Sequence, residues 1–258
     1  SNSSFYFGKF RHIKYMDNLK TNFGKRKVSK KLKTKLVQDI FTNVASNYDL
    51  MNDIMSFGSH RLWKTKLIDL MNIQENENVL DVGSGTGDLI NLILKLKKNN
   101  NIYAVDLNSE MLKYAEKRHK NNNVTFIRAN AEKLPFNNCS IDKYIISFCL
   151  RNVTDIENAL KESYRILKPG GIFYCLEFSS PESGLIKNLY NQYKKNIIPW
   201  IGSKVAKNKE AYKYLEESID QFPNQKKLIS SLHKIGFINS NYLNIFNGIV
   251  SIHIAYKI

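Results

Sequence analysis

The stretch Val79-Leu80-Asp81-Val82-Gly83-Ser84-Gly85-Thr86-Gly87-Asp88 decides the fold of this 258-residue chain. It predicts a buried strand, then a glycine turn, then the start of a helix. Glycine permits positive φ angles and lets a ligand approach the main chain without an obstructing Cβ. The spacing is GxGxG, not the GxGxxG of dinucleotide-binding folds, and no Lys-Ser/Thr pair follows, which excludes a P-loop.

Two acidic residues accompany this turn and narrow the choice of ligand. Asp106 ends the next predicted strand, 23 residues after Gly83, where a carboxylate can accept hydrogen bonds from both hydroxyls of a ribose. Asp81 precedes the glycines and suits a cationic ligand better than a phosphate. S-adenosylmethionine fits both, because it is a ribonucleoside with a positive sulfonium and no phosphate. Asn130 and Ala131, after the third strand, are placed to meet an adenine edge; the alternative is a glycine turn that serves packing only.

Outward from this stretch, apolar strands alternate with amphipathic helices. The expected strands are Val79–Val82, Ile102–Val105, Val124–Ile127, Tyr144–Phe148 and Ile172–Phe178, with helices at about 87–98, 109–120 and 155–167. Such alternation predicts βαβ units and a parallel sheet. At the end of the chain, Asn247-Gly248 between the runs Phe237–Phe246 and Gly248–Tyr256 predicts an antiparallel hairpin. We therefore expect an α/β, Rossmann-like fold with a mostly parallel seven-stranded sheet, as in class I S-adenosylmethionine-dependent methyltransferases.

Two further segments complete the predicted organisation. Residues 36–48 and 59–71 have apolar residues at helical spacing and predict an N-terminal helical extension of the domain. Residues 182–232 interrupt the strand–helix alternation and predict a helical lid or substrate insert within a methyltransferase domain over 36–258. Residues 1–35 carry eleven Lys and Arg side chains against one acid, Asp17, and are interpreted as a basic N-terminal arm.

Composition excludes several classes of protein. Hydrophobic residues make up 43% and charged residues 24%, which argues against global disorder. No apolar run is long enough to span a membrane, and three cysteines without CxxC spacing argue against a disulfide framework or a zinc ribbon. No metal site is expected. The net charge of +16 is concentrated in the arm, and no aromatic–basic motif accompanies it, so nucleic-acid binding is the least favoured reading of the charge.

Several motifs resemble the signatures of the ubiquinone/menaquinone biosynthesis C-methyltransferases, over about residues 37–258. They are YDLMNDIMS (48–56), GSHRLWK (58–64), LRNVTD (150–155), LKPGG (167–171), LEFS (176–179), YLEESI (214–219) and Gly248-Ile249-Val250. The resemblance implies methyl transfer from S-adenosylmethionine to a ring carbon of a polyprenylated benzoquinol, or of demethylmenaquinol in bacteria. It implies cofactor contacts at Thr86, Asp106, Asn130, Ala131 and Ser147, to which the glycine stretch adds Asp81, Gly83 and Gly85. Two departures affect the fine cofactor geometry: Cys149 stands where the family usually has Gly, and the loop reads GSGTG, not AGGTG.

The resemblance also places Tyr48, Arg151 and Asn152 against the quinol. A ring carbon becomes nucleophilic when a neighbouring phenol, with a pKa near 10, loses its proton. Arg151 stays protonated, so we expect it to stabilise the phenolate electrostatically and Asn152 to orient the other quinol oxygen. Tyr48 is expected to close the pocket or relay a proton. The direct base is left open among four candidates: Asp49, His60, Asp155 and Glu177.

Location and partners are inferred from charge and substrate class. The acid-poor arm predicts a transit segment and a mitochondrial protein on the matrix side of the inner membrane. A membrane-borne substrate predicts peripheral contact with the membrane through residues 182–232. The lysines expected there are Lys187, Lys194, Lys195, Lys204, Lys207 and Lys209. A homodimer and a coenzyme Q biosynthesis complex are possible assemblies for this family. Methylation of another lipid or small molecule and a non-catalytic quinone-binding scaffold remain the alternatives.

Overall fold

The computed structural model describes residues 20–45, 48–56, 58–120, 122–182, 184–193, 196 and 209–258. Its centre is a seven-stranded sheet in the order β5-β4-β3-β6-β7-β9-β8. The five parallel strands are β3 (Asn78–Val82), β4 (Asn101–Asp106), β5 (Val124–Arg128), β6 (Ile141–Ser147) and β7 (Leu167–Phe178). The antiparallel pair at the edge is β8 (Ile238–Ile245) and β9 (Val250–Tyr256). This confirms the predicted α/β fold with its C-terminal hairpin.

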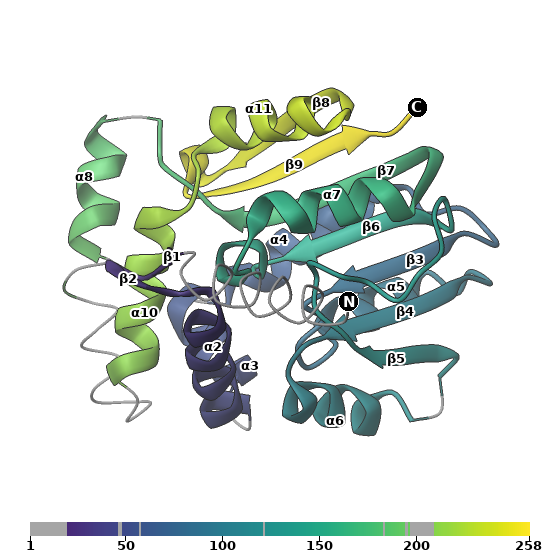
Figure 1. Ribbon diagram of the computed structural model, residues 1–258, viewed down its shortest axis with the longest axis horizontal. Helices are drawn as coiled ribbons and strands as arrows, with labels where there is room; N and C mark the ends of the chain where they lie inside the picture. Colours follow the sequence, from purple (N-terminus) through teal and green to yellow (C-terminus); the bar gives the residue numbers. More distant parts are fainter. Residues whose placement is uncertain are drawn as a thin grey trace, which may run out of the picture.

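Helices cover both faces of the sheet. In Figure 1, α7 (Ile156–Ile166) and α11 (Gln225–Ile235) lie in front of it, and α4 (Ser59–Met71) and α5 (Asp88–Lys95) lie behind it. The helix α6 (Ser109–Arg118) lies beside β4 and β5. Because the central strand β3 is covered on both sides, its apolar residues Val79, Leu80 and Val82 are all buried.

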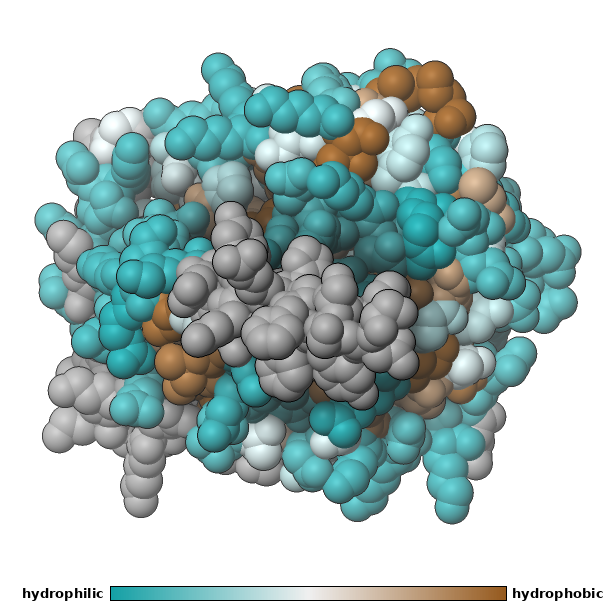
Figure 2. Space-filling view, viewed as in Figure 1, coloured by the Kyte–Doolittle hydropathy of each residue, from teal (hydrophilic) through white to brown (hydrophobic). Residues whose placement is uncertain are grey.

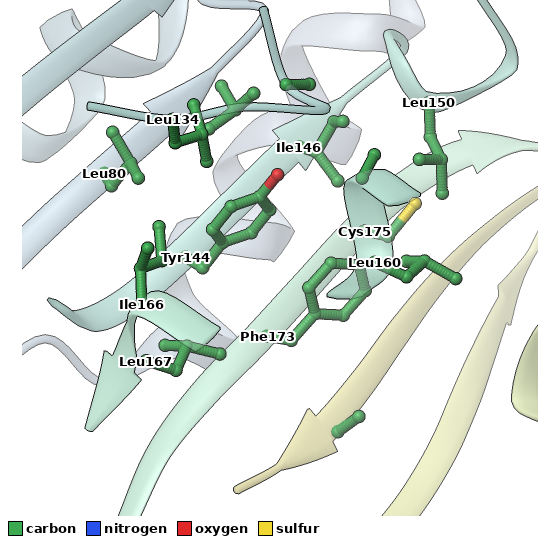
Figure 3. Packing of buried hydrophobic residues seen from close by; sticks show 14 of the residues in the cluster. Leu80, Leu134, Tyr144, Ile146, Leu150, Leu160, Ile166, Leu167, Phe173 and Cys175 are labelled. Atoms are coloured by element: carbon green, nitrogen blue, oxygen red, sulfur yellow. The ribbon is translucent and has the colours of Figure 1, made fainter. Parts of the chain in front are cut away.

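Two large hydrophobic clusters form the core around the sheet, one on each face. Figure 3 shows the cluster beneath α7, where Tyr144 of β6 stacks on Phe173 of β7 with ring centroids 5.3 Å apart. Trp63 and Leu67 of α4 belong to the other cluster. Most of the surface seen in Figure 2 is hydrophilic, with hydrophobic side chains in small separate groups. Across the described ranges, no helix is long and apolar enough to cross a membrane.

A group of helices lies beyond the carboxyl ends of the parallel strands, at the left of Figure 1. It contains α2 (Lys30–Val44), α3 (Tyr48–Ser56), α8 (Gly184–Gln192) and α10 (Lys209–Gln221). The sequence predicted one helix over 36–48, whereas the structure has α2 and then α3. The helix α2 begins at Lys30 because the Ser29 side chain caps it, accepting from the backbone N–H of Leu32.

Two segments differ from the predicted organisation. Residues 20–35, assigned to a basic arm, are folded: β1 (Lys20–Phe23) and β2 (Arg26–Ser29) form a hairpin that packs on α10 and leads into α2. Residues 1–19 lie outside the described residues. The helix α11, assigned to the insert 182–232, packs against α7 and β8 and is a core element. In the C-terminal hairpin, Phe246–Gly248 form a short 3-10 turn in which all three residues have positive φ.

Candidate functional site

The glycine loop follows β3 at the carboxyl edge of the sheet. Gly83, Gly85 and Gly87 have φ of 71°, 56° and 84°, angles that other L-residues rarely adopt. The N–H groups of Gly83 and Ser84 donate to the carbonyl of Val105 at 2.7 and 3.0 Å, which ties the loop to β4. A Cβ on Gly85 would lie 3.5 Å from Cε1 of Tyr48. The loop therefore faces the helical group across a narrow space.

Asp106 holds this loop from the end of β4. Its Oδ2 accepts from the Gly85 N–H at 2.9 Å, and its Oδ1 accepts from the Asn108 N–H at 2.8 Å. Burial raises the pKa of the Asp106 carboxyl, and the hydrogen bonds from the Asn108 and Gly85 N–H groups oppose that shift. Each carboxylate oxygen retains acceptor capacity, because an ionised carboxylate has about four lone-pair sites.

A cavity of about 750 Å³, open solvent included, lies between the loop and the helices; we call it the glycine-loop cavity. Val37 and Phe41 of α2 and Tyr48 of α3 lie on one side of it. Seven predicted site residues line it: Tyr48, Gly83, Gly85, Asp106, Asn130, Ala131 and Asn152. The sequence thus predicted one continuous site from residues far apart along the chain.

Four predicted residues lie outside that lining, namely Asp81, Thr86, Ser147 and Arg151. Asp81 is 1% exposed, and among the described residues neither carboxylate oxygen has a hydrogen-bond partner. Burial raises its pKa to about 7, opposed by the charge of Lys64. The buried hydroxyl of Ser147 likewise has no partner within the described ranges. Thr86 instead donates to Asp49 Oδ1 of α3 at 2.7 Å, which fastens α3 to the glycine loop.

A second cavity of about 390 Å³, open solvent included, adjoins the first, and we call it the arginine cavity. It is lined by Arg151, Asn52 and Tyr214 and shares Phe41, Tyr48 and Asn152 with the glycine-loop cavity. The three residues predicted to face a substrate, Tyr48, Arg151 and Asn152, therefore meet in one cavity next to the glycine loop.

Arg151 is fixed by a buried ion pair. Its Nη1 donates to Glu177 Oε1 and to the carbonyl of Phe148, both at 2.7 Å, and the Arg151 and Glu177 side chains are 7% and 0% exposed. Burial alone would lower the pKa of the guanidinium, but the charge of Glu177 and the neighbouring tyrosines raise it. Burial raises the pKa of Glu177, and Arg151 opposes that shift. The guanidinium thus stays charged beside the cavity.

The backbone of Phe148 is strained where it organises this site. Its φ is 51°, a value that is uncommon for a bulky residue and clusters at functional sites. In this conformation one carbonyl oxygen accepts from both Arg151 Nη1 and Asn152 Nδ2, at 2.7 and 3.3 Å. Burial raises the pKa of the Tyr48 phenol to about 12, so it remains a hydrogen-bond donor at neutral pH.

The four candidate bases each have a structural contact. Asp49 pairs with Arg118 and accepts from Thr86, and Asp155 pairs with Lys30 and caps α7. His60 is buried against Asp53, and its pKa is lowered by burial and by Lys64. Glu177 pairs with Arg151.

Three further residues belong to the site, and the sequence had indicated only Cys149, as a departure from the family pattern. Phe41 lines both cavities, but its helical spacing indicated only a core position. Cys149 lies against the loop, so that a Cβ on Gly83 would be 2.2 Å from its sulfur. Tyr214 donates to Asn152 at 3.1 Å; its place in the YLEESI motif was the available signal.

These residues fit S-adenosylmethionine. The loop leaves room for a ligand at Gly85, Asp106 offers acceptors for two hydroxyls, and the unpartnered carboxylate of Asp81 suits a positive charge. A family model for the ubiE/COQ5 methyltransferase family matches residues 28–257. The chain belongs to this family. Its cofactor is S-adenosylmethionine, and it is an S-adenosylmethionine-dependent C-methyltransferase, as the sequence predicted.

Named relatives agree with this assignment, and solved structures share the fold. The chain is 50% identical over 247 residues to the ubiquinone/menaquinone biosynthesis C-methyltransferase UbiE of Rickettsia typhi, covering 92% of this chain and 99% of the relative. For UbiE of Rickettsia prowazekii the identity is 49% with the same coverage. A methyltransferase structure from Thermotoga maritima has a TM-score of 0.61 at 21% identity, covering 86% and 100% of the two chains. Phosphoethanolamine N-methyltransferase 2 of Haemonchus contortus, in complex with S-adenosyl-L-methionine, has a TM-score of 0.58 at 16% identity, covering 76% and 52%. These two structures show a shared fold only.

The relatives overturn one prediction. The basic N-terminal residues predicted a mitochondrial location on the matrix side of the inner membrane. That prediction is wrong, because the similar enzymes are bacterial proteins from Rickettsia. Part of the segment that suggested targeting, residues 20–35, contributes a hairpin and the first turn of α2 to the fold. At least one basic residue of this segment therefore has a structural role, because Lys30 forms an ion pair with Asp155.

Proposed function

We propose that the protein transfers a methyl group from S-adenosylmethionine to a ring carbon of a polyprenyl methoxy-benzoquinol in ubiquinone biosynthesis. The observation that carries the proposal is the arginine cavity, which adjoins the glycine-loop cavity and contains Tyr48, Arg151 and Asn152. A substrate ring in one cavity would lie next to a cofactor in the other. The UbiE name printed for the relatives includes menaquinone biosynthesis, so a demethylmenaquinol is the second candidate acceptor.

The cofactor supplies an electrophilic methyl group on a positive sulfonium. We assign Asp106 to binding the ribose hydroxyls of the cofactor and Asp81 to a positive group on it. Gly83, Gly85 and Thr86 belong to the loop that the cofactor contacts. The remaining polar edges of the cofactor are assigned to Asn130, Ala131 and Ser147. Support for Asp106 is its place in the cavity lining and its free acceptor capacity. Thr86 has the weakest support, because its hydroxyl is already bound to Asp49.

The charge on Arg151 would lower the pKa of a nearby phenol and so make the ring carbon nucleophilic. Since Glu177 holds the guanidinium in place, no reorganisation is needed when the phenolate forms. We assign Tyr48 to closing the cavity between the two ligands, where its high pKa keeps it a donor and not a base. In-line alignment of the two reacting atoms would supply much of the remaining rate enhancement.

Peripheral membrane contact through residues 182–232 is part of the proposal, because the substrate tail is a lipid. Of the lysines expected there, Lys194, Lys195, Lys204 and Lys207 lie outside the described residues, and Lys187 is exposed on α8. A homodimer and association with other quinone-biosynthesis enzymes remain predictions. A non-catalytic quinone-binding scaffold is the contrasting reading.

Product mass spectrometry tests the proposal. Purified protein is incubated with S-adenosylmethionine and a short-tailed demethyl methoxy-benzoquinol, kept reduced, and in parallel with a demethylmenaquinol. We expect a product one methyl heavier from the benzoquinol, with the methyl on ring carbon. If only the demethylmenaquinol is methylated, the substrate is a menaquinone precursor and the proposed benzoquinol substrate is wrong. Cofactor binding without product from either acceptor would favour the scaffold.

A further inference from the structure

Tyr214 reaches the site from α10, which no prediction included in the catalytic machinery. Its hydroxyl donates to Asn152 Oδ1 at 3.1 Å, between residues 62 positions apart. Both side chains are buried, at 6% and 8% exposure, and both line the arginine cavity. Burial raises the pKa of the Tyr214 phenol, so the hydroxyl remains protonated and able to donate.

The other end of the same amide is also fixed. Asn152 Nδ2 donates to the carbonyl of Phe148 at 3.3 Å. The reversed amide would turn its oxygen toward that carbonyl, and two acceptors repel each other. The Phe148 carbonyl, which can only accept, therefore selects one orientation of the Asn152 amide, and the Tyr214 hydroxyl holds the amide oxygen in that orientation. A primary amide has two N–H donors, so one N–H remains for a ligand.

Tyr214 is itself held by the N-terminal hairpin. The rings of Phe23 and Tyr214 are stacked, with centroids 4.5 Å apart and planes at 19°. The backbone N–H of Lys25 donates to Glu217 Oε2, on the same helix as Tyr214, at 3.1 Å. Strand β1, which carries Phe23, precedes residues 28–257 that the family model matches. A segment outside that match thus supports the position of Tyr214.

We propose that Tyr214 is a positioning residue that holds the Asn152 amide so that it presents an N–H donor, and not its oxygen, to an oxygen atom of the substrate ring. The proposal rests on the proposed function, because it makes Asn152 a hydrogen-bond donor to the substrate in the same site. The substrate oxygen that accepts a hydrogen bond from the Asn152 N–H is then a phenolate or carbonyl oxygen. A substrate with a donor only at that ring position would leave the N–H without a partner, which costs affinity.

Four variants test this assignment by steady-state methylation, with cofactor affinity and melting temperature measured alongside. Tyr214→Phe keeps the ring and its stack on Phe23 but removes the hydroxyl, and we expect kcat to fall about tenfold with unchanged cofactor affinity. Asn152→Asp keeps the acceptor for Tyr214 and the side-chain volume but removes the N–H donor, and we expect kcat to fall about hundredfold. In the Asn152→Ala background, Tyr214→Phe should lower kcat by less than about twofold, because Tyr214 acts on the substrate only through Asn152.

Tyr212→Phe is the matched control. Tyr212 lies on the same helix and is fully buried, and its hydroxyl has no hydrogen-bond partner among the described residues. We expect it to keep wild-type kcat. Retained activity in Asn152→Asp, an undiminished tenfold cost of Tyr214→Phe in the Asn152→Ala background, or an equal loss in Tyr212→Phe would each overturn the inference. Absence of turnover in the wild type would instead overturn the proposed function, and this inference with it.

Discussion

Arg151 Nη1 lies 2.7 Å from Glu177 Oε1 in a pair that is almost wholly shielded from water. Arg151 follows β6 and Glu177 lies near the end of β7, and these strands are parallel neighbours. The sheet itself therefore sets the distance between the two side chains. A buried pair of this kind contributes little net stability, but removing one partner leaves an uncompensated charge.

The cost of removing one partner of the pair, compared with removing both, separates the catalytic from the structural role of Arg151. Arg151→Ala should lower kcat about hundredfold while cofactor affinity persists, and should lower the free energy of unfolding by about 3–5 kcal/mol. In the double variant Arg151→Ala/Glu177→Gln most of the stability should return, because no buried charge remains, but turnover should not. Urea unfolding and steady-state kinetics measure the two effects. Recovery of both together would show that Arg151 acts only through stability.

Asp106 is predicted to carry cofactor affinity. Asp106→Ala removes the acceptors that we assign to two ribose hydroxyls and also frees the Gly85 and Asn108 N–H groups. A hydrogen bond to a charged group is worth about 1.5–3 kcal/mol, so affinity for S-adenosylmethionine should fall at least about tenfold. Isothermal titration calorimetry measures this affinity. Asp142→Ala is the control, because Asp142 lies at the start of β6 and therefore at the opposite edge of the sheet from the site. Unchanged affinity in Asp106→Ala would remove the ribose assignment.

The strands, and the site residues attached to their ends, were predictable because both follow from local patterns. Apolar runs define β3 and β4; the glycines come directly after β3, and Asp106 is the last residue of β4. The β1–β2 hairpin was not predictable in the same way. Its residues, KTNF and RKVS, show no clear apolar alternation, and its partner α10 lies almost 200 positions along the chain. The segment gains its buried side from tertiary contacts, in which Phe23 stacks on Tyr214 of α10 and joins a cluster with Val37 of α2.

Thr86 shows a different limit of sequence reasoning. It lies between Gly85 and Gly87 in the loop, yet its hydroxyl is bound to Asp49, which the sequence placed among the candidate bases. The pairing depends on where α3 docks, and no periodicity within 48–56 specifies that. Likewise, the contact of Cys149 with Gly83 depends on the packing of two separate loops.

The Gly83–Cys149 contact predicts a compensating pair of substitutions. Gly83→Ala would place a Cβ 2.2 Å from Cys149 Sγ and 2.5 Å from its Cβ, at a φ of +71°. We expect it to abolish cofactor binding and to destabilise the fold by about 2–4 kcal/mol, from the clash and the left-handed backbone together. Gly83→Ala/Cys149→Gly removes the clash and should regain about half of that loss in thermal unfolding. A double variant no more stable than Gly83→Ala would assign the whole cost to backbone strain.

Asp81 gives the protein a predictable dependence of stability on pH. Its folded pKa of about 7 lies above the ordinary 3.8, because burial disfavours the charged carboxylate. The folded state therefore holds this proton more tightly than the unfolded state does. The contribution of Asp81 to the free energy of unfolding is greatest below the unfolded pKa and falls as pH rises from about 4 to 7. The full loss is about 4 kcal/mol, at about 1.4 kcal/mol for each pKa unit.

Asp81→Asn isolates this contribution, because an amide of the same shape does not titrate. Urea unfolding at pH 5, 6, 7 and 8 should show the wild type losing stability relative to Asp81→Asn as pH rises, with a constant difference above about pH 8. A cation bound beside the carboxylate would lower its pKa, so saturating S-adenosylmethionine should reduce the difference between the two proteins at pH 7 to 8. Parallel pH profiles in the free proteins would contradict the raised pKa. A cofactor that stabilises both proteins equally would contradict the assignment of Asp81 to a positive group.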